Sequence, residues 1–154
     1  MSDMELVEAI DKKVGEVRTE SLDISVGELV ALHGAKELII QPDFQRLFRW
    51  SVEQRSRLVE SMLLELPIPS IFVIEKEDGV LELIDGLQRT SSLIQFVSAG
   101  EIGLQPLELD GCDLVAELNG QKFDDLPLTL RLRLKRTSIR TVVIKRQSSQ
   151  FLRY

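Results

Sequence analysis

The sequence has very few of the residues on which thiol and histidine chemistry depend. Its 154 residues include one cysteine, Cys112, and one histidine, His33. A lone cysteine excludes an internal disulfide and is typical of proteins of the reducing cytoplasm, and a lone histidine excludes a His-rich metal site. We therefore interpret Cys112 as a small, partly buried apolar residue and His33 as the end of a helix that stops before Gly34.

Long apolar runs are also lacking. No stretch approaches the ~18 residues of a membrane span, and the N-terminal sequence MSDMELVEAIDKK is acidic and amphipathic, unlike a secretory signal. A composition of 44% hydrophobic and 29% charged residues is ordinary for a soluble globular protein. We expect one domain over residues 1–154, truncated at its C-terminal end because the chain stops at QFLRY without a helix cap or a polar tail.

Acidic residues are absent from the last part of the chain. Residues 1–125 hold all 25 acidic and 11 of the 19 basic residues, a net charge of −14, whereas residues 126–154 hold the other 8 basic residues, a net of +8. The overall charge of −6 argues against a general nucleic-acid coat. Two interpretations of the basic segment 131–146 remain: it contacts DNA phosphates, or its cations pair with acids elsewhere in the fold.

The order of helix and strand signals predicts an α+β fold. Three predicted helices begin with a capping box, in which a serine is followed three residues later by Glu or Gln; they span residues 2–14, 26–33 and 51–66. A fourth is predicted at 87–98, with Leu93, Ile94 and Val97 on its buried face. Strands are predicted at 19–25, 37–42, 70–76, 80–84 and 138–146, with a hairpin turn at Asp78-Gly79.

Two segments are less regular. Turn signals at Asp110-Gly111 and Asn119-Gly120 predict short strands within residues 101–123. In residues 126–136 the leucines alternate as in a strand but also fall at helical spacing. Asp124, Asp125 and Pro127 are good helix-start signals, so we favour a helix there.

The stretch LIDGLQRTSSL, residues 83–93, is typical of a strand end, a tight turn and a helix start. Arg89 then lies in the first helical turn, where the positive end of the helix dipole disfavours a cation by up to about 1 kcal/mol. An anion held by Arg89 and by the free N–H groups of the helix start would offset this cost. Gly86 would let the anion approach the backbone, and Thr90 and Ser91 would add hydroxyl donors.

The neighbouring polar residues admit two roles. In a phosphate site, Asp85 would orient Arg89 or hold a hydrated Mg²⁺, and Gln88 would position a water or a ligand edge. The alternative is a structural Asp85–Arg89 pair that only fixes the turn.

A second cluster, DFQRLFRW, spans residues 43–50. Arg46 and Arg49 so close together before a helix indicate a polyanion contact, although surface pairing with nearby acids explains them equally well. Trp50 is either a hydrophobic staple for the following helix or a base-stacking ring.

The two clusters, in this order, resemble the N-terminal domain of GmrSD-type, modification-dependent restriction proteins. The resemblance rests on IIQPDFQRLFRWSVEQRSRLVESMLLELPIPSIFVIE, DGVLELIDGLQRTSSLIQF and LNGQKFDDLP, and covers about residues 24–146. It implies a ParB/sulfiredoxin-like α+β fold, a small mixed sheet with flanking helices. It also implies nucleotide binding and hydrolysis that regulate the cleavage of modified foreign DNA in phage defence.

The family's motifs carry over to named positions. Asp85, Gly86, Gln88 and Arg89 match the Asp-Gly-Gln-Gln-Arg motif, and Gln45 and Arg46 match the Pro-x-Phe-Gln-Arg block. Leu87 departs from the first glutamine of the motif, which removes one polar contact and weakens the case for hydrolysis. No HNH-type nuclease motif is found, so we expect the nuclease in another domain or subunit. Sulfiredoxin chemistry is disfavoured, because it requires a cysteine at the helix start.

Three functional hypotheses follow. The first is a nucleotide-binding regulatory domain, and potentially an NTPase that uses GTP or another NTP with Mg²⁺. The second is a DNA-phosphate-binding sensor without hydrolysis, and the third is a purely structural or partner-docking domain. The first hypothesis predicts that Asp85, Arg89, Arg46 and Arg49 converge on one concave surface at the start of helix 87–98.

Overall fold

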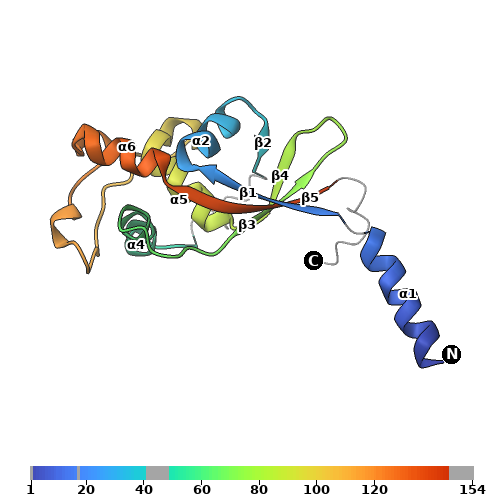
Figure 1. Cartoon of the computed structure of the whole chain (residues 1–154). Coiled ribbons are helices and arrows are strands. Elements are labelled where there is room, and N and C mark those ends of the chain that lie inside the picture. The colour runs from blue at the N-terminus through green and yellow to red at the C-terminus, as the bar shows by residue number, and fades with distance from the viewer. Residues whose placement is uncertain (1, 17, 41–48, 146–154) are drawn as a thin grey trace.

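The computed structural model of the chain describes residues 2–16, 18–40 and 49–145, and it confirms the predicted α+β class (Figure 1). Within these ranges the α-helices are α1 (Asp3–Glu16), α2 (Val26–Gly34), α4 (Val52–Leu63), α5 (Leu87–Ser98) and α6 (Leu128–Arg136). The strands are β1 (Thr19–Ser25), β2 (Leu38–Ile39), β3 (Ile71–Glu75), β4 (Leu81–Asp85) and β5 (Ser138–Ile144). Single-turn 3-10 helices lie at η1 (Ala99–Ile102), η2 (Ala116–Leu118) and η3 (Phe123–Asp125).

The strands form one mixed sheet in the order β1-β5-β3-β4-β2. β1 and β5 are antiparallel, β5 and β3 are parallel, β3 and β4 form an antiparallel hairpin, and β2 runs parallel to β4. The hairpin turn falls at Asp78-Gly79 as predicted, where Gly79 has a φ of +86° and the Asp78 carboxylate accepts the N–H of Val80. The sheet therefore brings segments from both ends of the chain together.

One face of the sheet carries the core. Ile139 and Val143 of β5 and Ile71 and Val73 of β3 are almost fully buried on this face, while Arg140 between them is exposed. The same cluster contains buried apolar residues from α2, α4, α5 and α6. These four helices also contact one another, so the sheet and the helix layer enclose a single core.

Local sequence signals set several helix starts. Ser25 caps α2 and Ser51 caps α4, and in each case the complete capping box forms with Glu28 or Gln54. The helix prediction for residues 126–136 is confirmed by α6 and the prediction for 87–98 by α5. On α5, Leu93 and Ile94 are fully buried as predicted, whereas Val97 is half-buried.

Three predicted elements differ from the structure. β2 covers only two residues of the strand predicted at 37–42, of which 41 and 42 lie outside the described residues. α4 ends at Leu63 rather than Leu66, and Glu65 after it has a left-handed φ of +60°. The strands predicted within 101–123 are wrong, because this segment holds only turns and 3-10 helices.

Side chains of α4 explain the irregular path of that segment. The Glu60 carboxylate, on a residue only 2% exposed, accepts the N–H groups of Leu114 and Val115 at 3.0 and 2.7 Å. The Ser56 hydroxyl accepts the N–H of Asp110 at 2.9 Å. Since these side chains satisfy the backbone donors, the loop needs no partner strand.

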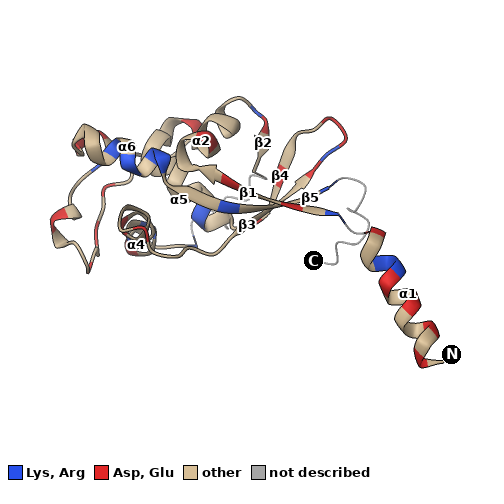
Figure 2. Ribbon diagram, viewed as in Figure 1, with Lys and Arg blue, Asp and Glu red and all other residues tan. Residues whose placement is uncertain are grey.

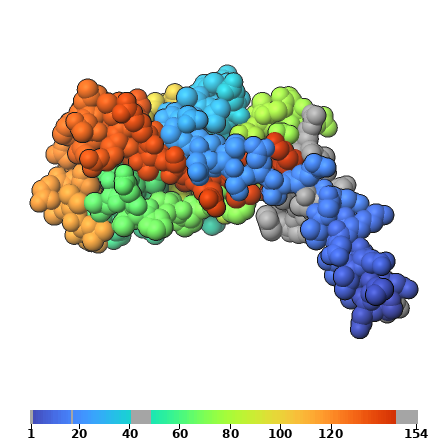
Figure 3. Space-filling view, viewed as in Figure 1, coloured from blue at the N-terminus to red at the C-terminus, as the bar shows by residue number. Residues whose placement is uncertain are grey.

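α1 stands apart from this body. It projects away from the start of β1, far from α6 (Figures 1 and 3), and none of its residues is buried. In the described ranges no helix has the length and apolar character required to cross a membrane.

Candidate anion-binding site

The turn from β4 into α5 is built around Gly86. This residue is the N-cap of α5 in a left-handed conformation, with φ +98°, and no side chain caps the helix. A Cβ at this position would lie 2.5 Å from Cγ2 of Ile71 and 3.3 Å from Nη2 of Arg89. Glycine is therefore required both for the backbone conformation and for the packing of the turn against β3. Its predicted role in ligand approach stays a prediction.

Arg89 turns back from the first turn of α5 towards the start of the helix. Its Nη2 donates a hydrogen bond of 2.9 Å to the carbonyl oxygen of Ser70, just before β3. Its Nε is buried and has no hydrogen-bond partner. The predicted structural Asp85–Arg89 pair is wrong: no ion pair joins these two described residues, and Asp85 is exposed. Spacing of four residues favours a pair only within one helix, and Asp85 still belongs to β4.

This geometry leaves the Arg89 guanidinium under-satisfied. A guanidinium carries five N–H donors, and here one hydrogen bond is formed. A buried donor without a partner costs about 1–3 kcal/mol, and the cation also lies at the positive end of the helix dipole. An anion at the uncapped start of α5 would offset the cost of the helix dipole and would accept hydrogen bonds from the free backbone N–H groups.

Gln88 connects this turn to the second arginine cluster. Its Oε1 accepts the backbone N–H of Trp50 at 3.2 Å, across 38 residues of sequence. Residues 49–50 therefore lie beside the first turn of α5, with Arg49 exposed and Trp50 packed against the core. The predicted convergence on one concave surface stays a prediction, because only the backbone of Trp50 is placed at Gln88 and Gln45 and Arg46 lie outside the described residues.

The hydroxyl residues after Arg89 behave differently from one another. Ser91 donates to the carbonyl oxygen of Leu87 at 2.7 Å, so its hydroxyl already has a partner. Thr90 is fully buried, and its Oγ1 has no hydrogen-bond partner. The assignment of Thr90 to phosphate binding stays a prediction. Leu87, where the resemblance leads us to expect glutamine, packs against the hydrophobic core.

A buried polar link from α4 holds α5 in place. Arg55 is only 7% exposed, and its Nη1 donates to Oε1 of Gln95 at 2.9 Å. The Gln95 amide donates in turn to the carbonyl oxygen of Gln105 at 2.9 Å. Burial lowers the pKa of the Arg55 guanidinium. The sequence carried a signal for this role, because Arg55 shares the helical face of the buried Leu58 and Met62. No signal marked Ser70, which contributes only a backbone carbonyl.

The described residues contain no group of three or more His, Cys, Asp and Glu side chains that would hold a metal ion. Asp85 is thus a single exposed carboxylate. Mg²⁺ that binds mainly through phosphate oxygens and water needs no more than one or two protein carboxylates. The described part of the turn therefore offers one carboxylate and no cage for a resident metal, and the Mg²⁺ assignment stays a prediction.

A second charged surface lies at the same edge of the sheet as the β4–α5 turn, where β3 and β5 begin side by side. Four exposed cations of α6 and β5 make no ion pair with any described residue; they are Arg133, Lys135, Arg136 and Arg140. Figure 2 shows basic residues along α6. Pairing with acids elsewhere accounts for Lys145, which contacts Glu20 at 2.9 Å and Glu75 at 3.4 Å. The hydrogen bond to Glu20 is the main cause that raises the pKa of Lys145.

The comparisons with known proteins identify the family. No curated protein and no solved structure matches the chain significantly. Residues 26–153 match the sequence model of the family described as GmrSD restriction endonuclease, N-terminal domain. This range covers most of the chain, from α2 through β5, and includes both arginine clusters. The chain therefore belongs to the family of GmrSD restriction endonuclease N-terminal domains, and its role is in a restriction system.

Proposed function

We propose that the domain binds a nucleoside triphosphate, with the phosphates at the N-terminus of α5, and that this binding regulates a restriction system that acts on modified DNA in phage defence. The proposal places the nuclease in another domain or subunit, and the complex in the cytoplasm with its DNA target. The family supports the restriction role, and the geometry of the β4–α5 turn supports the nucleotide.

One observation carries the proposal. The Arg89 guanidinium lies at an uncapped helix start, has a buried Nε without a partner, and is held in this place by the Ser70 carbonyl. A cation with free donors beside free backbone N–H groups is suited to phosphate oxygens. A purely structural arginine would be expected to have its donors satisfied.

The other residues take supporting roles. Asp85 binds Mg²⁺ through water, and the metal supplies charge neutralisation on the phosphates when it is bound. Gln88 fixes the segment before α4 through the N–H of Trp50, and we assign the neighbouring, exposed Arg49 to the phosphates. Gln45 and Arg46 belong to this segment by sequence, and we assign them to the same ligand.

Hydrolysis is the finer part of the proposal. Leu87 replaces the first glutamine of the family motif and packs against the core. Gln88 and Arg89 are therefore the motif's remaining polar side chains in the first turn of α5. Gln88 has one amide oxygen engaged by Trp50, and its NH₂ group remains suited to orienting a water. Hydrolysis therefore rests on Gln88 and Arg89, with Asp85 holding the metal.

Binding and hydrolysis are tested separately. Thermal unfolding should be measured with GTP, ATP and CTP, each with Mg²⁺, and release of inorganic phosphate should be followed with the same nucleotides. We expect stabilisation by at least one nucleotide, and phosphate release that Gln88→Ala reduces. A ligand at a concentration about 100 times its dissociation constant stabilises the folded protein by about 2.7 kcal/mol. The proposal is wrong if none of the three nucleotides raises the unfolding temperature at millimolar concentration.

DNA-phosphate binding is the second candidate function, and the unpaired cations of α6 and β5 favour it. Phosphate contacts make DNA binding steeply dependent on salt, with a slope close to the number of contacts. A gel shift that weakens as salt is raised, and that loses part of its salt slope in Arg133→Ala, would support this function. Binding unaffected by that substitution would exclude the α6 surface.

A further inference from the structure

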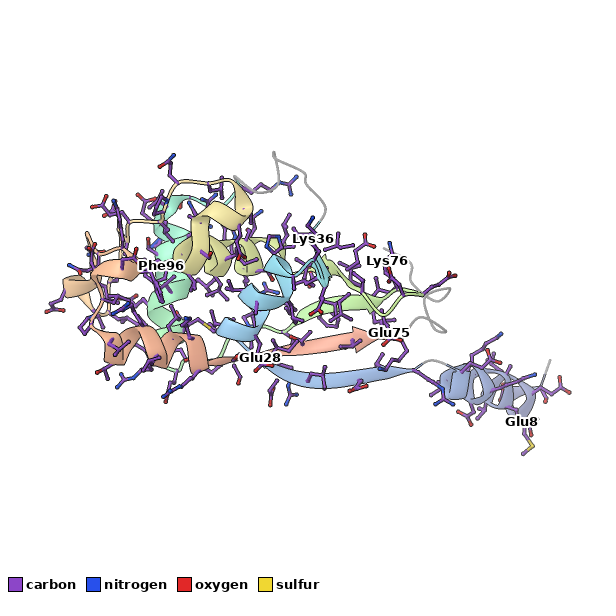
Figure 4. All side chains as sticks on the ribbon, turned by 90° about the horizontal axis from the view of Figure 1, so that it is seen from above. Glu8, Glu28, Lys36, Glu75, Lys76 and Phe96 are labelled. Atoms are coloured by element: carbon purple, nitrogen blue, oxygen red, sulfur yellow. The ribbon has the colours of Figure 1, made fainter. Side chains whose placement is uncertain are left out.

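α1 is an amphipathic helix whose apolar side chains are not buried by any of the described residues. Its large apolar residues are all exposed, by 49–73% of their surface: Met4, Leu6, Val7, Ile10 and Val14. Four of them, at positions 6, 7, 10 and 14, fall on one side of the helix. Figure 4 shows α1 separate from the rest of the domain, with Glu8 on it labelled. An isolated helix of this length is marginal in water, so its apolar side needs a cover.

The charge of α1 restricts which kind of surface can bury its apolar side. The helix carries five acids and two lysines, a net charge of −3. Two α1 helices packed on each other would bring together twice this charge, which disfavours a pair of α1 helices. The complementary surface is therefore both apolar and basic.

Such a surface exists on the same chain. A groove of about 560 Å³ lies where the end of α4, the end of α6 and the start of β5 meet; we call it the α6 groove. Its apolar wall includes Met62, Leu66 and Ile68, and its cations are Arg133, Arg136 and Arg140. Leu66 is 43% exposed. Two acids, Asp23 and Glu65, also line the groove, and the three arginines outnumber them.

We propose that α1 of one copy docks in the α6 groove of a second copy, and that the exchange is reciprocal. Within one chain α1 points away from the end of the sheet that carries α6 (Figure 1), so a second copy is the occupant that the arrangement favours. A reciprocal exchange closes as a two-fold dimer. A DNA backbone is the rival occupant, but it offers nothing apolar to Leu66 and Ile68.

The test uses the full chain and two kinds of variant. The first variant pair, Ile10→Gln with Val14→Gln, removes apolar side chains of α1 and leaves the charge of the helix unchanged. The second, Arg136→Glu with Arg140→Glu, reverses the charge of two arginines in the α6 groove. Lys12→Gln, on the opposite side of α1, is the control. Sedimentation equilibrium over a concentration series should give the wild type and the control twice the 17.5 kDa of one chain, and each variant pair should weaken dimerisation at least about tenfold.

Mixing the two variant pairs gives the decisive readout. In a mixed pair one α1 and one groove are intact, so one of the two contacts is restored and a heterodimer forms more tightly than either variant alone. Pairing of α1 with α1 predicts no such recovery. Three results would overturn the proposal: a monomeric wild type, a dimer that the groove variant leaves unchanged, or loss of DNA binding in the groove variant with the dimer intact. Circular dichroism and unfolding temperatures of the variants check that each folds.

Discussion

Arg89→Ala separates an arginine that binds phosphate from one that only holds a turn. In the free domain the substitution removes the hydrogen bond to Ser70, which is worth about 1.5–3 kcal/mol for a charged donor. It also removes a buried Nε without a partner, which costs about 1–3 kcal/mol, and an unfavourable dipole contact of about 0.3–1 kcal/mol. These contributions oppose one another, so the net change in the free energy of unfolding should stay within about 1 kcal/mol.

The nucleotide complex should respond much more strongly. At a concentration about 100 times its dissociation constant, a ligand stabilises the wild type by about 2.7 kcal/mol. For a chain of this length that is a rise of roughly 5–10 °C in the unfolding temperature. Loss of the charge-assisted contacts lowers the affinity by one to two decades, so at the same nucleotide concentration about half to five-sixths of this rise should disappear in Arg89→Ala.

The assay is thermal unfolding with and without NTP and Mg²⁺. Arg57→Ala is the matched control. Arg57 is a half-exposed arginine of α4, and its ion pair with Asp113 is long, at 3.8 Å. This variant should keep the full nucleotide effect. Arg89→Lys keeps the charge but loses the planar fork, so we expect a normal free domain with a reduced nucleotide effect. An unfolding temperature that falls by several degrees in Arg89→Ala, with the nucleotide effect unchanged, would refute the reasoning.

Three further predictions concern the frame around the site. Gly86→Ala should destabilise the domain by roughly 2–4 kcal/mol in urea unfolding, because Gly86 has a left-handed φ and β3 approaches it closely. Gly100 has open space around it, so Gly100→Ala should change the stability little. Equal effects of the two substitutions would contradict the account of the turn. Glu60→Ala should cost about 2–4 kcal/mol by leaving two loop N–H groups unpaired, and a loss below about 0.5 kcal/mol would show that the loop does not depend on this carboxylate. Burial, followed by the charge of Glu60, raises the pKa of the Cys112 thiol to about 11. The folded pKa therefore lies above that of the unfolded chain. The contribution of the buried thiol to stability is complete below about pH 8 and is lost as the pH rises towards 11. Alkylation of Cys112 at pH 8 should accordingly be much slower in the native protein than in urea, and equal rates would contradict this burial.

Local patterns predicted the frame of the fold well. The capping boxes at Ser25 and Ser51 form because every atom involved lies within three residues of the cap. The helix α6 was predicted over the alternating-strand interpretation from its start signals, and it is confirmed. Such features depend on spacing along the chain, which the sequence states directly.

The candidate site depended on contacts that spacing does not state. The partner of Arg89 is the Ser70 carbonyl, 19 residues earlier and on another element, so residue types gave no sign of it. The bond between Gln88 and Trp50 depends on the sheet that brings the two clusters together. The loop after α5 was predicted as strands because turn signals alone cannot reveal that Glu60 and Ser56 satisfy its backbone.

Backbone amide chemical shifts test the central claim most directly. A titration of the ¹⁵N-labelled domain with NTP and Mg²⁺ reports each N–H group separately, including those at the start of α5 and those of α6. Our account predicts that the largest shifts fall at Leu87, Gln88 and Arg89, with smaller shifts at Arg49 and Trp50. Largest shifts in α6, or no shifts at millimolar nucleotide, would contradict a phosphate site at the start of α5.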